Sequence, residues 1–189
     1  MPKQGCASSS AERRRSSRHD AMNEADLERI VSQYGPGLRR LVAAWERNAA
    51  AREDLLQEIL VALWRSLGRF RGECSERTFV YRVANNRILT HRFREAPQET
   101  DLEEAAAISD SRPTPEHEAE ATQRASHLMR ALHALPPAMR QVLTLSLEGL
   151  SRRESAEVLG ITENNATVRL SRARAALKKE LDRITGDTR

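Results

Sequence analysis

The chain has 189 residues, a formal net charge of +4 at pH 7 and a pI of about 9.6. With 39% hydrophobic, 31% charged and only 4% aromatic residues, the composition favours a helix-rich globular protein over a β-sandwich. No apolar run approaches the roughly twenty residues that span a bilayer, and Cys6 and Cys74 lack the spacing of a disulfide framework or zinc site. We therefore expect an all-α, cytoplasmic protein with no metal and no other cofactor.

Residues 1–22 are rich in Ser and Arg and show no periodic apolar positions. Such a composition cannot bury enough apolar surface to offset the entropy of ordering, so we predict a disordered basic tail. Regular helical patterning begins directly after this tail, and we hypothesise that translation starts at Met22.

Residues 23–95 form the first predicted helical domain. Apolar residues recur at helical spacing over 25–45, 52–67 and 77–95. We expect the first of these segments to be interrupted at Gly35, Pro36 and Gly37, because proline cannot continue a helix without losing a hydrogen bond.

The next segment, residues 96–118, is acidic and rich in proline, which predicts a flexible acidic linker. A second helical domain follows over 119–185, with breaks at the Leu135–Pro136–Pro137 stretch, at Gly149 and at Gly160. The predicted architecture is thus two small helical domains joined by a tether.

The second domain contains a predicted helix-turn-helix. Ser151 is a suitable N-cap with Glu154 three residues later, the spacing of a capping box. Gly160 ends that short helix, and Thr162 caps the next one. The inward face of this last helix is predicted to consist of Ala166, Leu170, Ala173, Leu177 and Leu181.

The opposite face of the last helix combines amide, guanidinium and methyl groups. Asn pairs with adenine, Arg pairs with guanine, and an exposed Val or Thr methyl group can meet the methyl group of thymine. Lys178 and Lys179 are better explained by the dipole of the helix C-terminus. The residues that we expect to contact DNA are Asn164, Asn165, Thr167, Val168, Arg169, Ser171, Arg172 and Arg174.

Two polar stripes are predicted in the first domain. The stripe on the helix over 52–67 would by itself be read as a solvated face. The stripe on the helix over 77–95 combines aromatic, amide and Arg side chains, which suits single-stranded nucleic acid. The first stripe is Asp54, Gln57, Glu58, Val61 and Arg65, and the second is Tyr81, Arg82, Asn85, Leu89 and Arg92, with Asn86 at its edge.

Four segments in this order resemble the extracytoplasmic-function group of bacterial RNA polymerase sigma factors, within the sigma-70 family. They are DLLQEILVALWRSLGRFRG, TFVYRVANNRI, LHALPPAMRQVLTLSLEGLSRRESAEVLGIT and VRLSRARAAL. The resemblance covers nearly all of the chain after Asn23 and implies sigma domain 2, a linker and sigma domain 4.

The resemblance implies a partner for each surface. The stripe over Asp54–Arg65 would dock on core RNA polymerase, and the helix after Thr162 would read the minus-thirty-five element of promoter DNA. An anti-sigma factor would be a further partner, and the linker would thread through the polymerase. The residues that would melt and capture the minus-ten element are Arg71, Tyr81, Arg82, Asn85, Asn86 and Arg92.

The chain departs from the family pattern at a few positions. Phe79 stands where Trp is frequent, Thr90 where Asp is common and Ser155 where Ile is usual. The stretch ENNATVRL also replaces a more frequent Gly-Thr-Val-Lys-Ser-Arg-Leu pattern. These differences concern the promoter sequence rather than the role.

Two other functions are compatible with parts of the sequence. A two-domain helix-turn-helix regulator that does not join the polymerase would need a dimer surface or an effector pocket, and we identify neither. An enzyme would need a phosphate-binding loop, a catalytic triad or a metal-ligand cluster, and none of these motifs is present.

Overall fold

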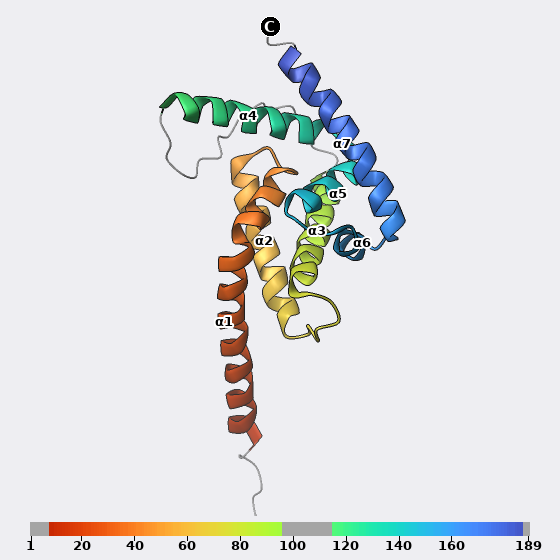
Figure 1. Cartoon of the computed structure of the whole chain (residues 1–189). Helices are drawn as coiled ribbons and strands as arrows, with labels where there is room; N and C mark the ends of the chain where they lie inside the picture. The colour runs from red at the N-terminus through yellow and green to blue at the C-terminus, as the bar shows by residue number, and fades with distance from the viewer. Residues whose placement is uncertain (1–7, 96–114, 187–189) are drawn as a thin grey trace, which may run out of the picture.

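The computed structural model describes residues 8–95 and 115–186, and within these residues it contains seven α-helices and no strand. The predicted all-α fold is confirmed (Figure 1). The helices are α1 (Ser8–Ala43), α2 (Ala49–Leu67), α3 (Glu76–Glu95), α4 (Pro115–Ala134), α5 (Pro137–Leu147), α6 (Arg152–Leu159) and α7 (Glu163–Gly186).

Helices α1, α2 and α3 pack together around apolar side chains that are fully buried. The apolar residues whose helical spacing predicted this helix face the core: Leu55, Leu56, Ile59 and Leu63 of α2 are buried. The helix begins at Ala49, earlier than predicted, because Asn48 caps it by accepting a hydrogen bond from the Ala51 N–H at 3.1 Å.

Helix α1 begins earlier than predicted. Residues 8–22, which we predicted to be disordered, continue α1, whereas residues 1–7 lie outside the described residues. The sequence from residue 8 to Tyr34 contains no Gly or Pro and many Ala, Arg and Glu residues. These residues have high helix propensity, so an established helix extends into them at little cost.

The predicted interruption of α1 at Pro36 is also wrong, because the helix passes through this proline. Ile30 before it and Leu38 after it are both fully buried in the same core. Burial on both sides of the proline offsets the lost backbone hydrogen bond, so tertiary packing overrides the local preference.

Helices α4 to α7 form the second helical domain, with breaks at the three predicted places. α5 has Pro136 as its N-cap residue, and Gly149 and Gly160 both adopt positive φ angles, of 78° and 64°. Glycine adopts this left-handed conformation without the strain that a Cβ atom would cause.

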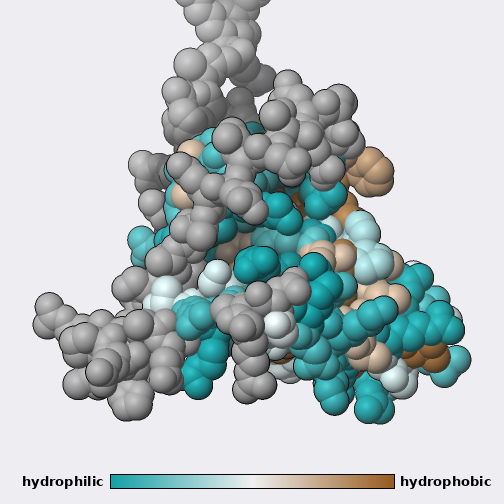
Figure 2. Space-filling view, turned by 90° about the horizontal axis from the view of Figure 1, so that it is seen from above, coloured by the Kyte–Doolittle hydropathy of each residue, from teal (hydrophilic) through white to brown (hydrophobic). Residues whose placement is uncertain are grey.

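The two helical domains share one continuous core of buried residues, and α6 lies beside α3 (Figure 1). On the face seen in Figure 2 hydrophilic side chains predominate, with hydrophobic ones in small separate groups. Of the predicted linker, residues 96–114 lie outside the described residues, and residues 115–118 belong to α4.

Candidate nucleic-acid interface

The helix-turn-helix is formed by α6, the turn at Gly160 and α7. The predicted capping box is confirmed: the Glu154 N–H donates to Ser151 Oγ at 3.2 Å, and the Ser151 N–H donates to Glu154 Oε2 at 2.8 Å. The hydrogen bond that the Glu154 carboxylate accepts from the Ser151 backbone N–H is the main cause that lowers the pKa of Glu154, and the Ser151 side chain acts in the same direction. The Asn165 N–H donates to Thr162 Oγ1 at 3.2 Å, so α7 also has its predicted cap.

Helix α7 presents its polar side outward. Ala166, Leu170 and Ala173 are buried against the other helices, as predicted, and Ile184 extends the same face. Val168 is 41% exposed among polar neighbours. Of the predicted DNA contacts, Thr167 and Arg169 are half-buried, and the exposed ones are Asn164, Asn165, Val168, Ser171, Arg172 and Arg174.

Two of these α7 side chains also contact protein atoms. Thr167 Oγ1 donates to the Glu163 carbonyl at 2.9 Å, and Arg174 Nη2 donates to Ser146 Oγ on α5 at 3.4 Å. The amides of Asn164 and Asn165 stand in the first turn of α7, the part of a recognition helix that reaches base edges.

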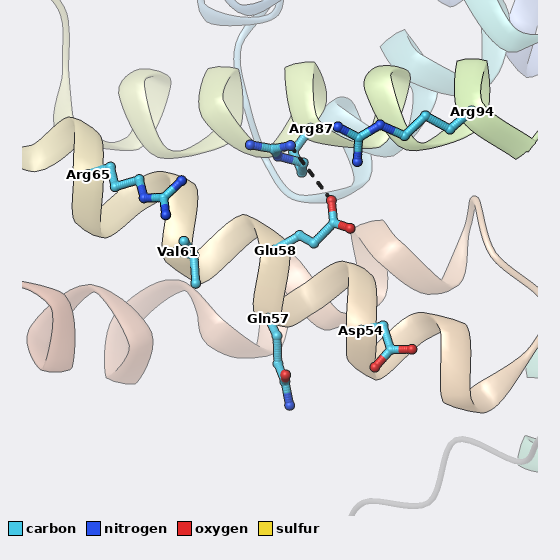
Figure 3. A pocket seen from close by; sticks show the side chains of 7 residues that line it. All are labelled: Asp54, Gln57, Glu58, Val61, Arg65, Arg87 and Arg94. Carbon is cyan, nitrogen blue, oxygen red and sulfur yellow. Dashed lines mark ion pairs between the residues drawn. The ribbon is translucent and has the colours of Figure 1, made fainter.

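The stripe on α2 lines a shallow groove of about 410 Å³ between α2 and α3 (Figure 3). The structure brings all five predicted residues to this groove: Asp54, Gln57, Glu58, Val61 and Arg65. Val61 is 46% exposed, an apolar side chain at the centre of a polar surface. A groove with one exposed apolar residue between charged ones is typical of a protein-binding surface.

Two further residues of the groove, Arg87 and Arg94, come from α3 and were not predicted. Glu58 points toward Arg87, and their Oε2 and Nη1 atoms are 3.7 Å apart (Figure 3). The spacing of seven residues places both arginines on one side of α3. That spacing was visible in the sequence, but which helix they would face was not.

The connection between α2 and α3 is held in place by several contacts. The rings of Phe70 and Phe79 stack with centroids 4.5 Å apart. Glu76 accepts hydrogen bonds from Arg29 at 2.8 and 2.5 Å and from the Tyr34 hydroxyl at 3.2 Å. The hydrogen bonds from Arg29 lower the pKa of Glu76, so the carboxylate stays charged at neutral pH.

The predicted single-strand stripe on α3 is only partly exposed. Arg71 and Asn86 are exposed, and Arg82 and Arg92 are half-buried, with Arg92 stacked over the Trp45 ring at 5.5 Å. The prediction of an open stripe is wrong for Tyr81 and Asn85.

Tyr81 and Asn85 retain only 3% and 4% of their exposure because the second helical domain covers them. Asn85 Oδ1 accepts a hydrogen bond from Gln141 Nε2 at 3.2 Å, and the Tyr81 hydroxyl donates to Glu148 Oε2 at 3.4 Å. Burial, and then the Glu148 carboxylate, raise the pKa of Tyr81, so its hydroxyl stays protonated.

No helix within residues 8–95 and 115–186 combines the length and the apolarity that crossing a membrane requires. In the same described residues, no group of three or more His, Cys, Asp or Glu side chains is arranged to hold a metal ion.

The chain matches two family models, Sigma-70 region 2 over residues 30–97 and Sigma-70, region 4 over residues 127–177. It is 31% identical over 163 residues to the ECF RNA polymerase sigma-E factor of Haemophilus influenzae, which covers 80% of this chain and 85% of that protein. It is 27% identical over 169 residues to the RNA polymerase sigma factor CnrH of Cupriavidus metallidurans, covering 85% and 88% of the two chains.

Two solved structures share the fold. CnrH in complex with the cytosolic domain of CnrY has a TM-score of 0.61 at 24% identity and covers 88% of this chain and 94% of that one. The sigma factor RpoE in complex with the anti-sigma factor NepR from Bartonella quintana has a TM-score of 0.67 at 20% identity, covering 83% and 97%.

Proposed function

Because this chain belongs to the extracytoplasmic-function group of the sigma-70 family, we propose that it is an alternative sigma factor, which binds core RNA polymerase and directs promoter-specific transcription initiation. The observation that carries this proposal is the presence of both sigma regions in one chain, the first with a charged groove and the second with an exposed polar helix.

The groove between α2 and α3 is the surface that docks on the polymerase. It presents carboxylates and guanidinium groups side by side around Val61, and an ion pair orients Glu58. A mixed-charge surface with an apolar centre selects a protein partner, whereas uniformly basic surfaces suit nucleic acid.

The first domain also melts the minus-ten element, through the α2–α3 connection and α3. Arg71 and Asn86 are exposed, and Arg82 and Arg92 are half-buried on the same helix as Asn86. Tyr81 and Asn85 belong to the same proposed set but are buried. Extruding a base from the stack costs a few kcal/mol, which binding to the polymerase and to these side chains offsets.

Helix α7 reads the minus-thirty-five element in the major groove. Its first turns expose Asn164, Asn165 and Val168, which supply amide and methyl groups to base edges. Arg172 and Arg174 lie further along the helix, four and six residues after Val168, where they would contact phosphates.

The protein acts as a specificity factor rather than a catalyst, and it works in the cytoplasm, where the polymerase and the promoter are. An anti-sigma factor is a further proposed partner. One structural neighbour was solved with the anti-sigma factor NepR, and the other with the cytosolic domain of CnrY. The alternative of a regulator that does not join the polymerase is not favoured, because such a regulator does not require sigma region 2, which this chain contains.

Gel filtration of the purified chain with core RNA polymerase tests this proposal. We expect co-elution, and we expect Gln57→Ala or Glu58→Ala to weaken core binding about tenfold, as loss of one interface anchor does. Glu53→Ala is the matched control, since Glu53 lies on the same helix outside the groove and its ion pair with Arg39 is exposed. Failure of the native chain to co-elute would refute the proposal.

A further inference from the structure

We propose that the second helical domain masks Tyr81 and Asn85 on the minus-ten face of the first domain in the free protein, and that Glu148 is the latch that holds this closed arrangement. The minus-ten role of the covered residues rests on the proposed function. The closed arrangement itself rests on contacts between residues that are far apart in the sequence.

Glu148 lies in the turn between α5 and α6, and its side chain is only 7% exposed. Arg40 on α1 donates to both of its carboxylate oxygens, from Nε to Oε1 at 2.9 Å and from Nη2 to Oε2 at 2.8 Å. The Tyr81 hydroxyl donates to Oε2, and Arg77 Nη2 donates to the Glu148 backbone carbonyl. One residue of the second domain is therefore held by three side chains of the first.

Two glycines allow this close approach. A Cβ atom on Gly37 would lie 2.3 Å from the Tyr81 hydroxyl oxygen and 2.7 Å from Glu148 Oε2. A Cβ atom on Gly149 would lie 3.0 Å from Arg77 Nη2, and its φ of 78° already favours glycine. Gly37, directly after Pro36, thus has a structural role, because the absence of a side chain leaves room for the Tyr81 hydroxyl and the Glu148 carboxylate.

A second group of contacts joins the domains where α1 ends. The Arg140 guanidinium of α5 stacks over the Trp45 ring at 4.9 Å, and His133 Nε2 lies 3.0 Å from the Ala43 carbonyl oxygen. The two domains are therefore fixed at two separated places rather than at a single hinge.

The closed arrangement covers part of one functional surface and leaves two others open. Tyr81 and Asn85 are buried under the second domain, where Glu148 and Gln141 occupy their polar groups. By contrast, Gln57 in the α2 groove and Asn164 on α7 are exposed. A closed molecule can therefore meet the polymerase, but it cannot present Tyr81 and Asn85 to a melted DNA strand until the latch opens.

The latch is suited to opening because its ion pair lies at the edge of the interface. Arg40 is 56% exposed although Glu148 is buried. Water and salt screen such a pair, so the pair itself contributes only a modest free energy to the closed state.

A distance measurement on the free chain tests the latch. Spin labels are placed at Ser32→Cys on α1 and Ala175→Cys on α7, both exposed positions, after Cys6 and Cys74 are replaced by Ser. We expect one narrow distance distribution for the otherwise native chain, and a longer, broader one for Glu148→Ala and for Gly37→Ala. In Gly37→Ala the new residue has a higher helix propensity than glycine, so opening of this variant could not be attributed to a less stable α1.

The matched control is Glu180→Ala, which removes one negative charge from α7, where Glu180 forms an ion pair with the nearby Arg183. It should leave the distance distribution of the native chain unchanged. Identical distributions for the native chain and both latch variants, or an equal change in the control, would overturn the latch.

Binding of a fluorescein-labelled single-stranded 12-mer of mixed sequence tests the masking. We expect Glu148→Ala and Gly37→Ala to bind this probe at least about fivefold more tightly than Glu180→Ala, because apparent affinity scales with the open fraction. Variants that open without binding more tightly than the control would refute the masking.

The two proposals fail in different ways. If the chain is not a sigma factor, it will fail to bind core polymerase, while the distances in the free chain remain as described. If only the latch is wrong, core binding persists and the distances do not respond to Glu148 or Gly37.

Discussion

Arg40 and Glu148, which are 108 residues apart in the sequence, form a two-pronged ion pair between the two helical domains. Two guanidinium nitrogens each donate to a different carboxylate oxygen. This bidentate geometry fixes both the distance and the relative orientation of the two side chains. The hydrogen bonds to Glu148 raise the pKa of Arg40, so the guanidinium is charged at every accessible pH.

A double-mutant cycle on this pair should reveal favourable coupling. For Arg40→Ala and Glu148→Ala we expect a coupling free energy of about 1–2 kcal/mol in urea unfolding, below the value for a fully buried pair because Arg40 is half exposed. The exposed pair of Arg39 and Glu53 provides the comparison and should give less than about 0.5 kcal/mol. Equal coupling in both cycles would mean that Arg40 and Glu148 merely meet at the surface.

Acid should weaken the native structure through His133. Burial, and then the charge of Arg140, lower the pKa of His133 from 6.5 to about 4, and Arg47 and Arg52 act in the same direction. Because the pKa of His133 is lower in the folded state, its protonation favours the unfolded chain. The free energy of unfolding therefore has its full value above about pH 6.5 and decreases progressively as the pH falls from there toward about 4.

We therefore expect the native chain to lose up to about 2 kcal/mol of unfolding free energy between about pH 7 and about pH 5 from this group. His133→Gln keeps a donor for the Ala43 carbonyl but does not titrate, so its unfolding free energy should change less over the same range. Parallel pH profiles for the two proteins would contradict the assignment.

Removal of the α6 cap should destabilise the helix-turn-helix. Ser151→Ala loses the hydrogen bond from the Glu154 N–H, which we expect to cost about 1 kcal/mol in urea unfolding. Ser32→Ala, an exposed position inside α1, should be neutral or slightly stabilising. If both substitutions had the same effect, the cap would contribute nothing to stability.

The features that sequence patterns predicted correctly depend on near neighbours in the chain. The capping box needs only Ser151 and Glu154, and the buried face of α7 follows from helical spacing of Ala166, Leu170 and Ala173. Such features are set by local geometry, so a sequence pattern is sufficient to find them.

The features that were missed depend on contacts between distant segments. Nothing near Tyr81 or Asn85 in the sequence indicates that Glu148 and Gln141 will cover them. The continuity of α1 through Pro36 likewise depends on burial of Leu38 in a core to which other helices contribute. The sequence pattern therefore identified the polar residues that share one side of α3, but it did not predict that Tyr81 and Asn85 among them are buried.

Substitutions in the first turn of α7 should change promoter choice. We expect Asn164→Ala or Asn165→Ala to lose about 1–3 kcal/mol of binding free energy for the preferred minus-thirty-five sequence and less for others. Arg172→Ala, further along α7 at a proposed phosphate contact, should weaken binding to all sequences alike. Binding selection from a randomised duplex library measures both, and a uniform loss for the Asn variants would remove them from base reading.

Initiation by a reconstituted holoenzyme tests directly whether this chain confers promoter specificity on the polymerase. Core RNA polymerase, the purified chain and fragmented genomic DNA of the source organism are combined, and the 5′ ends of the transcripts are mapped. We expect defined start sites that require the chain, with a shared sequence at minus-ten and at minus-thirty-five, and we expect Asn164→Ala to alter the minus-thirty-five sequence. Transcript ends that are the same with and without the chain would contradict a role as a sigma factor.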